Sequence, residues 1–132
     1  MRRILIDTNF LMIPYQFGVD IFSEFERICN FNYELAVFEP SIFELKKIMQ
    51  NASGKDKRAA QLALKLIKAK NIKLIKSKQK DVDLLILNNL GKDTIIATQD
   101  IQLKKRLLKN GMSVIILRQK KYLELIERKL YK

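Results

Sequence analysis

Short runs of apolar, often β-branched residues alternate along this chain with longer segments in which apolar residues recur at helical spacing. The first pattern is typical of buried strands, and the second is typical of helices that bury one face. We expect strands at residues 3–7, 33–38, 72–75, 93–98 and 114–117. We expect helices at residues 19–30, 41–50, 55–70, 82–90, 101–109 and 120–130.

This alternation of strands and helices predicts an α/β fold with a mostly parallel central sheet. The chain has 132 residues, which suits a single domain, and neither a repeat nor a Pro/Gly-rich linker divides it. We therefore expect residues 1–132 to form one domain. The helix expected at residues 19–30 carries Phe22 and Phe25 on one face, which suits either the core or a homodimer interface.

The composition excludes several kinds of site. The chain has no histidine, so Ser-His-Asp and Cys-His catalysis and His-ligated zinc are ruled out. Its single cysteine, Cys29, permits neither an internal disulfide nor a Cys-rich zinc site. Any chemistry must therefore use carboxylates, hydroxyls, amides and lysines, and a bound metal would be an ion that prefers oxygen ligands, such as Mg²⁺, Mn²⁺ or Ca²⁺.

No segment predicts membrane insertion. The longest uncharged stretch, residues 8–19, has 12 residues and contains Pro14 and Gly18, whereas a membrane-spanning helix needs about 20. The N-terminal residues lead directly into the first expected strand without an apolar signal segment. We therefore expect a cytoplasmic location and no membrane contact.

Positive charge is concentrated in the second part of the chain. Residues 1–50 hold 5 basic and 7 acidic residues, whereas residues 51–132 hold 21 and 7, and the whole chain carries +12. This balance favours a polyanionic partner, first RNA or DNA and second an anionic membrane, although solvation by lysine also accounts for it. The candidate RNA contacts are Lys55, Arg58, Lys104, Lys105, Arg118, Lys120 and Lys121.

Four acidic residues fall where expected strands end or the following helices begin. Asp7 ends the first strand, Asp100 follows the strand at residues 93–98, and Glu44 and Asp83 lie in first helical turns. Because the carboxyl ends of parallel strands meet at one edge of a sheet, we expect these carboxylates to gather there. They would repel one another unless a divalent cation lay among them.

Helix capping is the alternative role for three of these acids. Ser41 and Glu44 have the spacing of a capping box, Asp100 suits an N-cap, and Asp83 would favour the helix dipole. Asp7 is different, because a carboxylate buried after an apolar strand needs a partner or a metal. One or two Mg²⁺ or Mn²⁺ ions at this edge could bind a phosphodiester and activate water without a histidine.

These residues resemble the PIN-domain ribonucleases. The likeness rests on Ile4-Leu-Ile-Asp-Thr-Asn9, Glu44, Val82-Asp-Leu-Leu-Ile86 and Ala97-Thr-Gln-Asp100, in that order, and covers nearly the whole chain. It implies a PIN-like α/β/α sandwich and a single-strand-selective RNA endonuclease that uses one or two Mg²⁺ or Mn²⁺ ions. The matching catalytic and metal-ligating positions are Asp7, Glu44, Asp83 and Asp100, and the supporting positions are Asn9 and Thr98.

Within that family, the segment after Asn9 and the basic segment at residues 117–123 are similar to archaeal PIN proteins related to small-subunit ribosomal RNA-processing factors. This similarity implies ribosomal RNA as partner. A VapC-type toxin ribonuclease is the alternative, so an antitoxin or an assembly factor stays open as a further partner. A non-cleaving RNA-binding module also stays open, because Leu84 and Gln99 stand where the family often has a second acid and an Asn.

Overall fold

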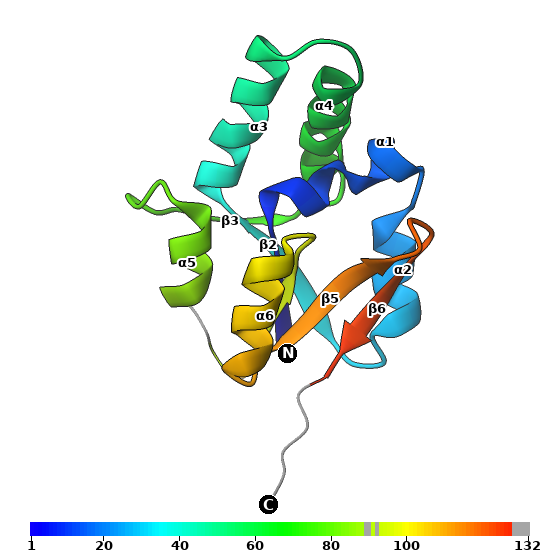
Figure 1. Ribbon diagram of the computed structural model, residues 1–132, viewed down its shortest axis with the longest axis vertical. Coiled ribbons are helices and arrows are strands. Elements are labelled where there is room, and N and C mark those ends of the chain that lie inside the picture. The colour runs from blue at the N-terminus through cyan, green and yellow to red at the C-terminus, as the bar shows by residue number, and fades with distance from the viewer. Residues whose placement is uncertain (89–90, 92, 128–132) are drawn as a thin grey trace, which may run out of the picture.

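A six-stranded sheet forms the centre of the molecule in the computed structural model, which describes residues 1–88, 91 and 93–127 (Figure 1). The strand order is β3-β2-β1-β4-β5-β6. All neighbours pair in parallel except β5 and β6, which pair antiparallel. The strands are β1 (Arg2–Ile6), β2 (Tyr33–Phe38), β3 (Lys73–Ile75), β4 (Thr94–Ala97), β5 (Ser113–Arg118) and β6 (Tyr122–Ile126).

Helices cover both faces of this sheet. Alternate residues of β1 face opposite sides, so Ile4 and Ile6 join one buried cluster and Leu5 joins the other. The first cluster is covered by the 3₁₀ helix η1 (Thr8–Met12), α1 (Ile13–Phe17), α2 (Ile21–Ile28), α3 (Glu39–Asn51) and α4 (Gly54–Ala69). The second is covered by α5 (Val82–Asn88) and α6 (Ile101–Lys109).

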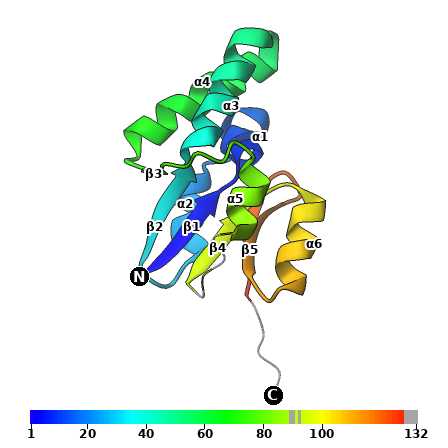
Figure 2. The same cartoon turned by 90° about the vertical axis from the view of Figure 1, so that its left-hand side faces the viewer.

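This arrangement confirms the predicted α/β/α sandwich with a mostly parallel sheet. Figures 1 and 2 show α3 and α4 standing together at one end of the molecule, and α5 and α6 side by side. The aromatic face of α2 lies in the core, where Phe25 is fully buried and contacts Phe10 and Phe22. Within the described ranges, no helix combines the length and the apolar character needed to cross a bilayer.

The helix predicted at residues 41–50 begins two residues earlier, at Glu39. Pro40 lies in its first turn, where the missing N–H of proline costs no hydrogen bond. Glu44 therefore lies in the second turn, and the predicted capping box between Ser41 and Glu44 is wrong. The sequence pattern also missed η1 and α1, because their few residues are too short to show a helical period.

The helix predicted at residues 120–130 is wrong as well, because residues 122–126 form strand β6. Gln119 and Lys120 both have positive φ angles, 51° and 56°, and the Lys121 N–H donates to the Arg118 carbonyl oxygen at 2.9 Å. These features turn the chain back on itself, so that β6 pairs with the otherwise open edge of β5. Residues 128–130 of the predicted helix lie outside the described residues.

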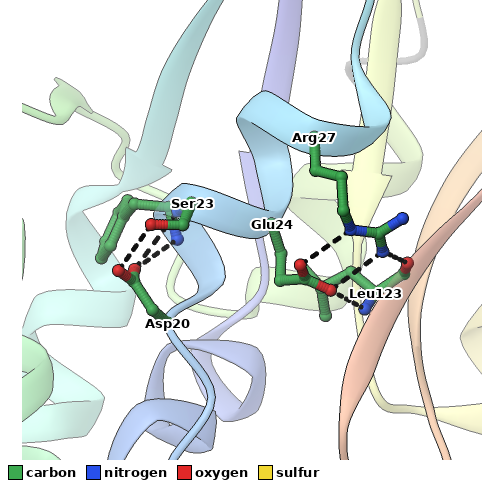
Figure 3. A network of polar contacts seen from close by, with 6 residues as sticks. Asp20, Ser23, Glu24, Arg27 and Leu123 are labelled. Carbon is green, nitrogen blue, oxygen red and sulfur yellow. Dashed lines mark hydrogen bonds and ion pairs between the residues drawn. The ribbon is translucent and has the colours of Figure 1, made fainter.

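Side chains of α2 cover part of the exposed edge of β6 (Figure 3). The Leu123 N–H donates to Glu24 Oε1 at 2.9 Å, and the Leu123 carbonyl oxygen accepts from Arg27 Nη2 at 2.9 Å. Arg27 also donates to Glu24, with Nε 2.8 Å from Oε2. Both outward backbone groups of Leu123 are thus bonded within the molecule, which reduces the capacity of this edge to pair with another chain.

Candidate functional site

Asp7 lies at the point where the strand order reverses. The chain moves outward from β1 to β2 and β3, and then crosses to β4 on the other side of β1. Such a switch point leaves a crevice at the carboxyl ends of the two central strands. Ile6 and Ala97 are register partners at these ends, so Asp7 and Thr98 follow side by side.

The buried Asp7 carboxylate is held by two hydrogen bonds. Its Oδ2 accepts from the Thr98 hydroxyl at 2.7 Å, and its Oδ1 accepts from the Thr8 N–H at 2.9 Å. Thr98 Oγ1 in turn accepts from the Asp100 N–H at 3.0 Å. Thr98 therefore connects the first and last of the four acids.

Glu44 reaches the same edge from α3. Its Oε1 accepts from Thr8 Oγ1 at 2.9 Å, and Thr8 Oγ1 also lies 2.8 Å from Oγ of the fully buried Ser41. The Thr8 hydroxyl has one proton, so donation to Glu44 requires Ser41 to donate to Thr8. Sequence reasoning missed this role of Thr8 and Ser41, because it depends on a contact between η1 and α3.

Helix capping is present at this edge, but it does not use all the acids. Asp100 is the N-cap of α6, where its Oδ1 accepts from the N–H groups of Gln102 and Leu103 at 2.9 and 3.1 Å. Asp81 caps α5 through Oδ1, which accepts from the Leu84 N–H at 3.3 Å. Asp83 then lies in the first turn of α5, as the sequence predicted.

One surface depression contains all four candidate acids. Thr98 does not line this depression but contacts it through its hydrogen bond to Asp7. No local pattern singled out Lys80, which is one of several exposed lysines in the segment before α5. The lining residues are Asp7, Thr8, Asn9, Met12, Glu44, Ile48, Lys80, Asp81, Val82, Asp83 and Asp100.

Three carboxylates of this depression, Asp7, Glu44 and Asp83, have pKa values raised by burial and by neighbouring charges. Burial is the main cause of the raised pKa of Asp7, and the charges of Asp83 and Asp100 add to it, while the bonds from Thr98 and Thr8 oppose it. Loss of solvent also raises the pKa of Glu44, with a further contribution from Asp7. The pKa of Asp83 rises for the same reasons, burial first and the charge of Asp100 second. A cation would relieve this repulsion.

The donor atoms of the depression suit a hard cation, although the carboxylates are spread across it. Within residues 1–88, 91 and 93–127, no three acidic side chains lie close enough together to form a metal cluster. Asn9 adds a neutral oxygen, because its buried Oδ1 has no hydrogen-bond partner among the described residues. Its backbone oxygen accepts from Gln99 Nε2 at 2.9 Å. An unpaired buried acceptor beside carboxylates is a group that a cation can satisfy.

The comparisons with known proteins agree with this geometry. Residues 4–120 match the family described as PIN like domain. The chain belongs to this family. It is 34% identical over 127 residues to Ribonuclease VapC4 of Methanocaldococcus jannaschii, an alignment that covers 95% of this chain and 97% of that protein. The fold is also similar to that of the PIN domain endonuclease Utp24, with a TM-score of 0.76, 21% identity and coverage of 98% and 96% of the two chains.

The structure separates the candidate RNA contacts into groups. Lys104, Arg118 and Lys120 line a second depression, which adjoins the first through Thr98. Lys55 and Arg58 lie near the start of α4, and Arg58 Nε donates to the Tyr15 hydroxyl of α1. Lys105 and Lys121 are exposed neighbours that do not line the second depression.

Proposed function

We propose that this PIN-family protein is a divalent-metal-dependent endoribonuclease that cuts single-stranded RNA. The observation that carries the proposal is the single depression that holds Asp7, Glu44, Asp83 and Asp100 at the switch point of the sheet. Family membership and the identity to a protein named as a ribonuclease support it. Oxygen donors without histidine fit Mg²⁺ or Mn²⁺, one or two ions of which would be held by these four acids together with Asn9.

A divalent ion bound there would supply an activated water and neutralise charge on the phosphodiester. The chain's own residues prepare the site for it. Thr98 and Thr8 fix the orientation of the Asp7 carboxylate, and Thr8 holds Glu44 in place. Lys80 lies at the same depression, where its ammonium can contact a substrate phosphate. Without histidines to support attack by the ribose 2′-hydroxyl, we expect products with 5′-phosphate and 3′-hydroxyl ends.

The proposal also includes a biological role, for which there are three candidates. Ribosomal RNA processing is the role that the sequence resemblance implied, whereas the 34% identity to Ribonuclease VapC4 favours a VapC-type ribonuclease. The likeness to Utp24, at 21% identity, bears on the fold alone. A non-cleaving RNA-binding module is the third candidate. It is favoured because Leu84 and Gln99 stand where the family often has a second acid and an Asn. The cytoplasmic location stays a prediction.

Cleavage of an end-labelled structured RNA with and without Mn²⁺ tests the activity. The diagnostic variant is Asp100→Asn, because Asn caps a helix about as well as Asp and the charge alone is lost. The matched control is Asp20→Asn, the same change at the N-cap of α2 outside the depression. We expect wild type and Asp20→Asn to cut, with activity abolished by EDTA, and Asp100→Asn to be strongly impaired.

Other outcomes separate the alternatives. Equal cutting by all three proteins would contradict a role for Asp100 in the reaction. RNA binding without cutting would favour the non-cleaving module, and products with 2′,3′-cyclic phosphate would exclude the proposed mechanism. A single cut in intact ribosomal RNA at a processing boundary would support the processing role over the toxin role.

A further inference from the structure

The second depression, which we call the β5 groove, lies along the carboxyl edge of the sheet beside the carboxylates. Its lining includes Phe17 from α1, Ile101 and Lys104 from α6, Arg118 from the end of β5, and Lys120 from the β5–β6 turn. Its lining also includes Gln99 and Thr98, and the Thr98 hydroxyl donates to Asp7 of the first depression. An RNA strand that runs across the carboxylates toward β5 would enter the β5 groove next.

The groove offers an aromatic surface next to cations. Phe17 packs partly against the core, and Lys120 Nζ lies 5.9 Å from the centre of its ring. Ile101 adds an apolar side chain to the lining of the groove and is 61% exposed, so a ligand can reach it. Aromatic rings that lie beside lysines are the features with which proteins stack unpaired bases and bind the backbone of single strands.

The cationic side chains of the groove differ in whether they form ion pairs within the protein. Arg118 forms an ion pair with Glu124 at 3.1 Å, so its charge is partly balanced. Lys104 and Lys120 form no ion pair with any described residue. The two lysines are therefore the groups whose charge is available to a phosphate.

We propose that the β5 groove is a nucleotide-binding subsite of the RNA substrate. The nucleotide beside the scissile phosphate places its base against Phe17 and Ile101, and its phosphate contacts Lys104 and Lys120. The Gln99 amide is held by its bond to the Asn9 backbone, which leaves its carbonyl oxygen to accept from a base edge. This proposal rests on the proposed function, because the carboxylates define where the scissile phosphate lies.

Binding of a fluorescently labelled single-stranded RNA to the full chain in EDTA tests the subsite without cleavage. We expect Phe17→Leu, which keeps an apolar side chain but removes the ring, to weaken binding about 5- to 20-fold. Lys104→Gln and Lys120→Gln should each weaken it severalfold and reduce the slope of log affinity against log salt by about 0.7. Unchanged thermal unfolding temperatures would show that the variants fold.

Each variant has a matched control outside the groove. Lys109→Gln changes another exposed lysine of α6, Lys65→Gln changes an exposed lysine of α4, and Phe43→Leu removes an exposed ring on α3. We expect each control to weaken binding less than about twofold. Equal losses in controls and groove variants would show diffuse electrostatic binding and overturn the subsite.

An RNA series with a single abasic nucleotide at each position in turn provides the second test. The loss caused by Phe17→Leu should disappear at one abasic position, and that position should adjoin the bond that wild type cuts in Mn²⁺. A loss that is the same at every position would overturn base stacking on Phe17. If wild type cleaves RNA and the groove variants bind RNA as tightly as wild type does, the subsite is refuted and the nuclease proposal stands. If RNA binding depends on the groove but no RNA is cleaved, the nuclease proposal is refuted and the groove remains an RNA-binding site.

Discussion

The Thr98 hydroxyl donates to Asp7 Oδ2 at 2.7 Å and joins two residues that lie 91 positions apart. The same oxygen of Thr98 accepts from the Asp100 N–H, so it positions both a buried carboxylate and the start of α6. This hydroxyl links the ends of β1 and β4, the two strands on either side of the crevice.

Replacing Thr98 with valine should therefore impair both stability and activity. Valine matches the shape of threonine, but it leaves an oxygen of the buried Asp7 carboxylate without its donor. We expect the free energy of unfolding to fall by about 1–3 kcal/mol in urea denaturation, and RNA cleavage to decrease. Thr98→Ser, which keeps the hydroxyl, should retain most of both. Equal stability of the valine variant and wild type would show that the bond contributes little.

Asp7→Asn should stabilise the metal-free protein and abolish its response to metal. Burial and the neighbouring charges of Asp83 and Asp100 make the ionised Asp7 unfavourable in the folded state. Mg²⁺ or Mn²⁺ at about 100 times its Kd should raise the free energy of unfolding of wild type by about 2.7 kcal/mol. Thermal unfolding with and without metal measures both effects.

The control for this experiment is Asp20→Asn, whose carboxylate bonds Ser23 and Phe22 outside the depression (Figure 3). Its response to metal should equal that of wild type. A metal response that survives in Asp7→Asn would show that the ion binds elsewhere.

The stability advantage of Asp7→Asn should depend on pH. The folded-state pKa of Asp7 lies above its ordinary value of 3.8, so the folded protein retains this proton to higher pH than the unfolded chain does. Ionising Asp7 therefore costs stability as pH rises above about 3.8, and the full cost is reached above the folded pKa.

We would measure the free energy of unfolding of Asp7→Asn and of wild type in EDTA over this pH range. The difference between the two reports the contribution of Asp7 ionisation. The difference cancels the carboxylates of Asp20, Glu24 and Glu34, whose lowered pKa values favour the folded state as pH rises. A difference that shrinks as pH rises would contradict a raised pKa for Asp7.

Glu24→Ala should weaken the edge of the sheet. The substitution removes the acceptor of the Leu123 N–H and the partner of Arg27, both of which are shown in Figure 3. We expect a loss of about 1–2 kcal/mol in urea denaturation and concentration-dependent self-association in light scattering, because β6 then presents unpaired backbone groups. Glu26→Ala, on the same helix but outside this network, should change neither.

Much of the site could be predicted because its residues are placed by local pattern. Asp7 directly follows β1, Asp100 comes three residues after the end of β4, and Asp83 lies in a first turn after the capping Asp81. Glu44 was found for a partly wrong reason, since the helix that carries it begins at Glu39 and its partner is Thr8. Lys80 had no local signal, and the capping-box spacing of Ser41 did not indicate its contact with Thr8, because both roles depend on which segments meet.

The C-terminal segment shows where local pattern is insufficient. Leu123 and Ile126 recur at helical spacing, whereas Leu123 and Leu125 alternate as in a strand, and the helical interpretation was the one chosen for residues 120–130. In the folded molecule, β5 offers a row of backbone groups, and Leu123 becomes buried when residues 122–126 pair with it. The free energy of that pairing and burial outweighs the weak local preference.

The sequence by itself determined most of the element types, the parallel α/β class, the exclusion of histidine chemistry and the choice of four acids, since these follow from local periodicity and composition. Only the tertiary structure decided which groups meet. The bonds of Thr98 with Asp7 and of Thr8 with Glu44, and the pairing of β6 with β5, join segments that approach each other only after the strands adopt their order. Long-range hydrogen bonds and burial determine these contacts, and no spacing along the chain encodes them.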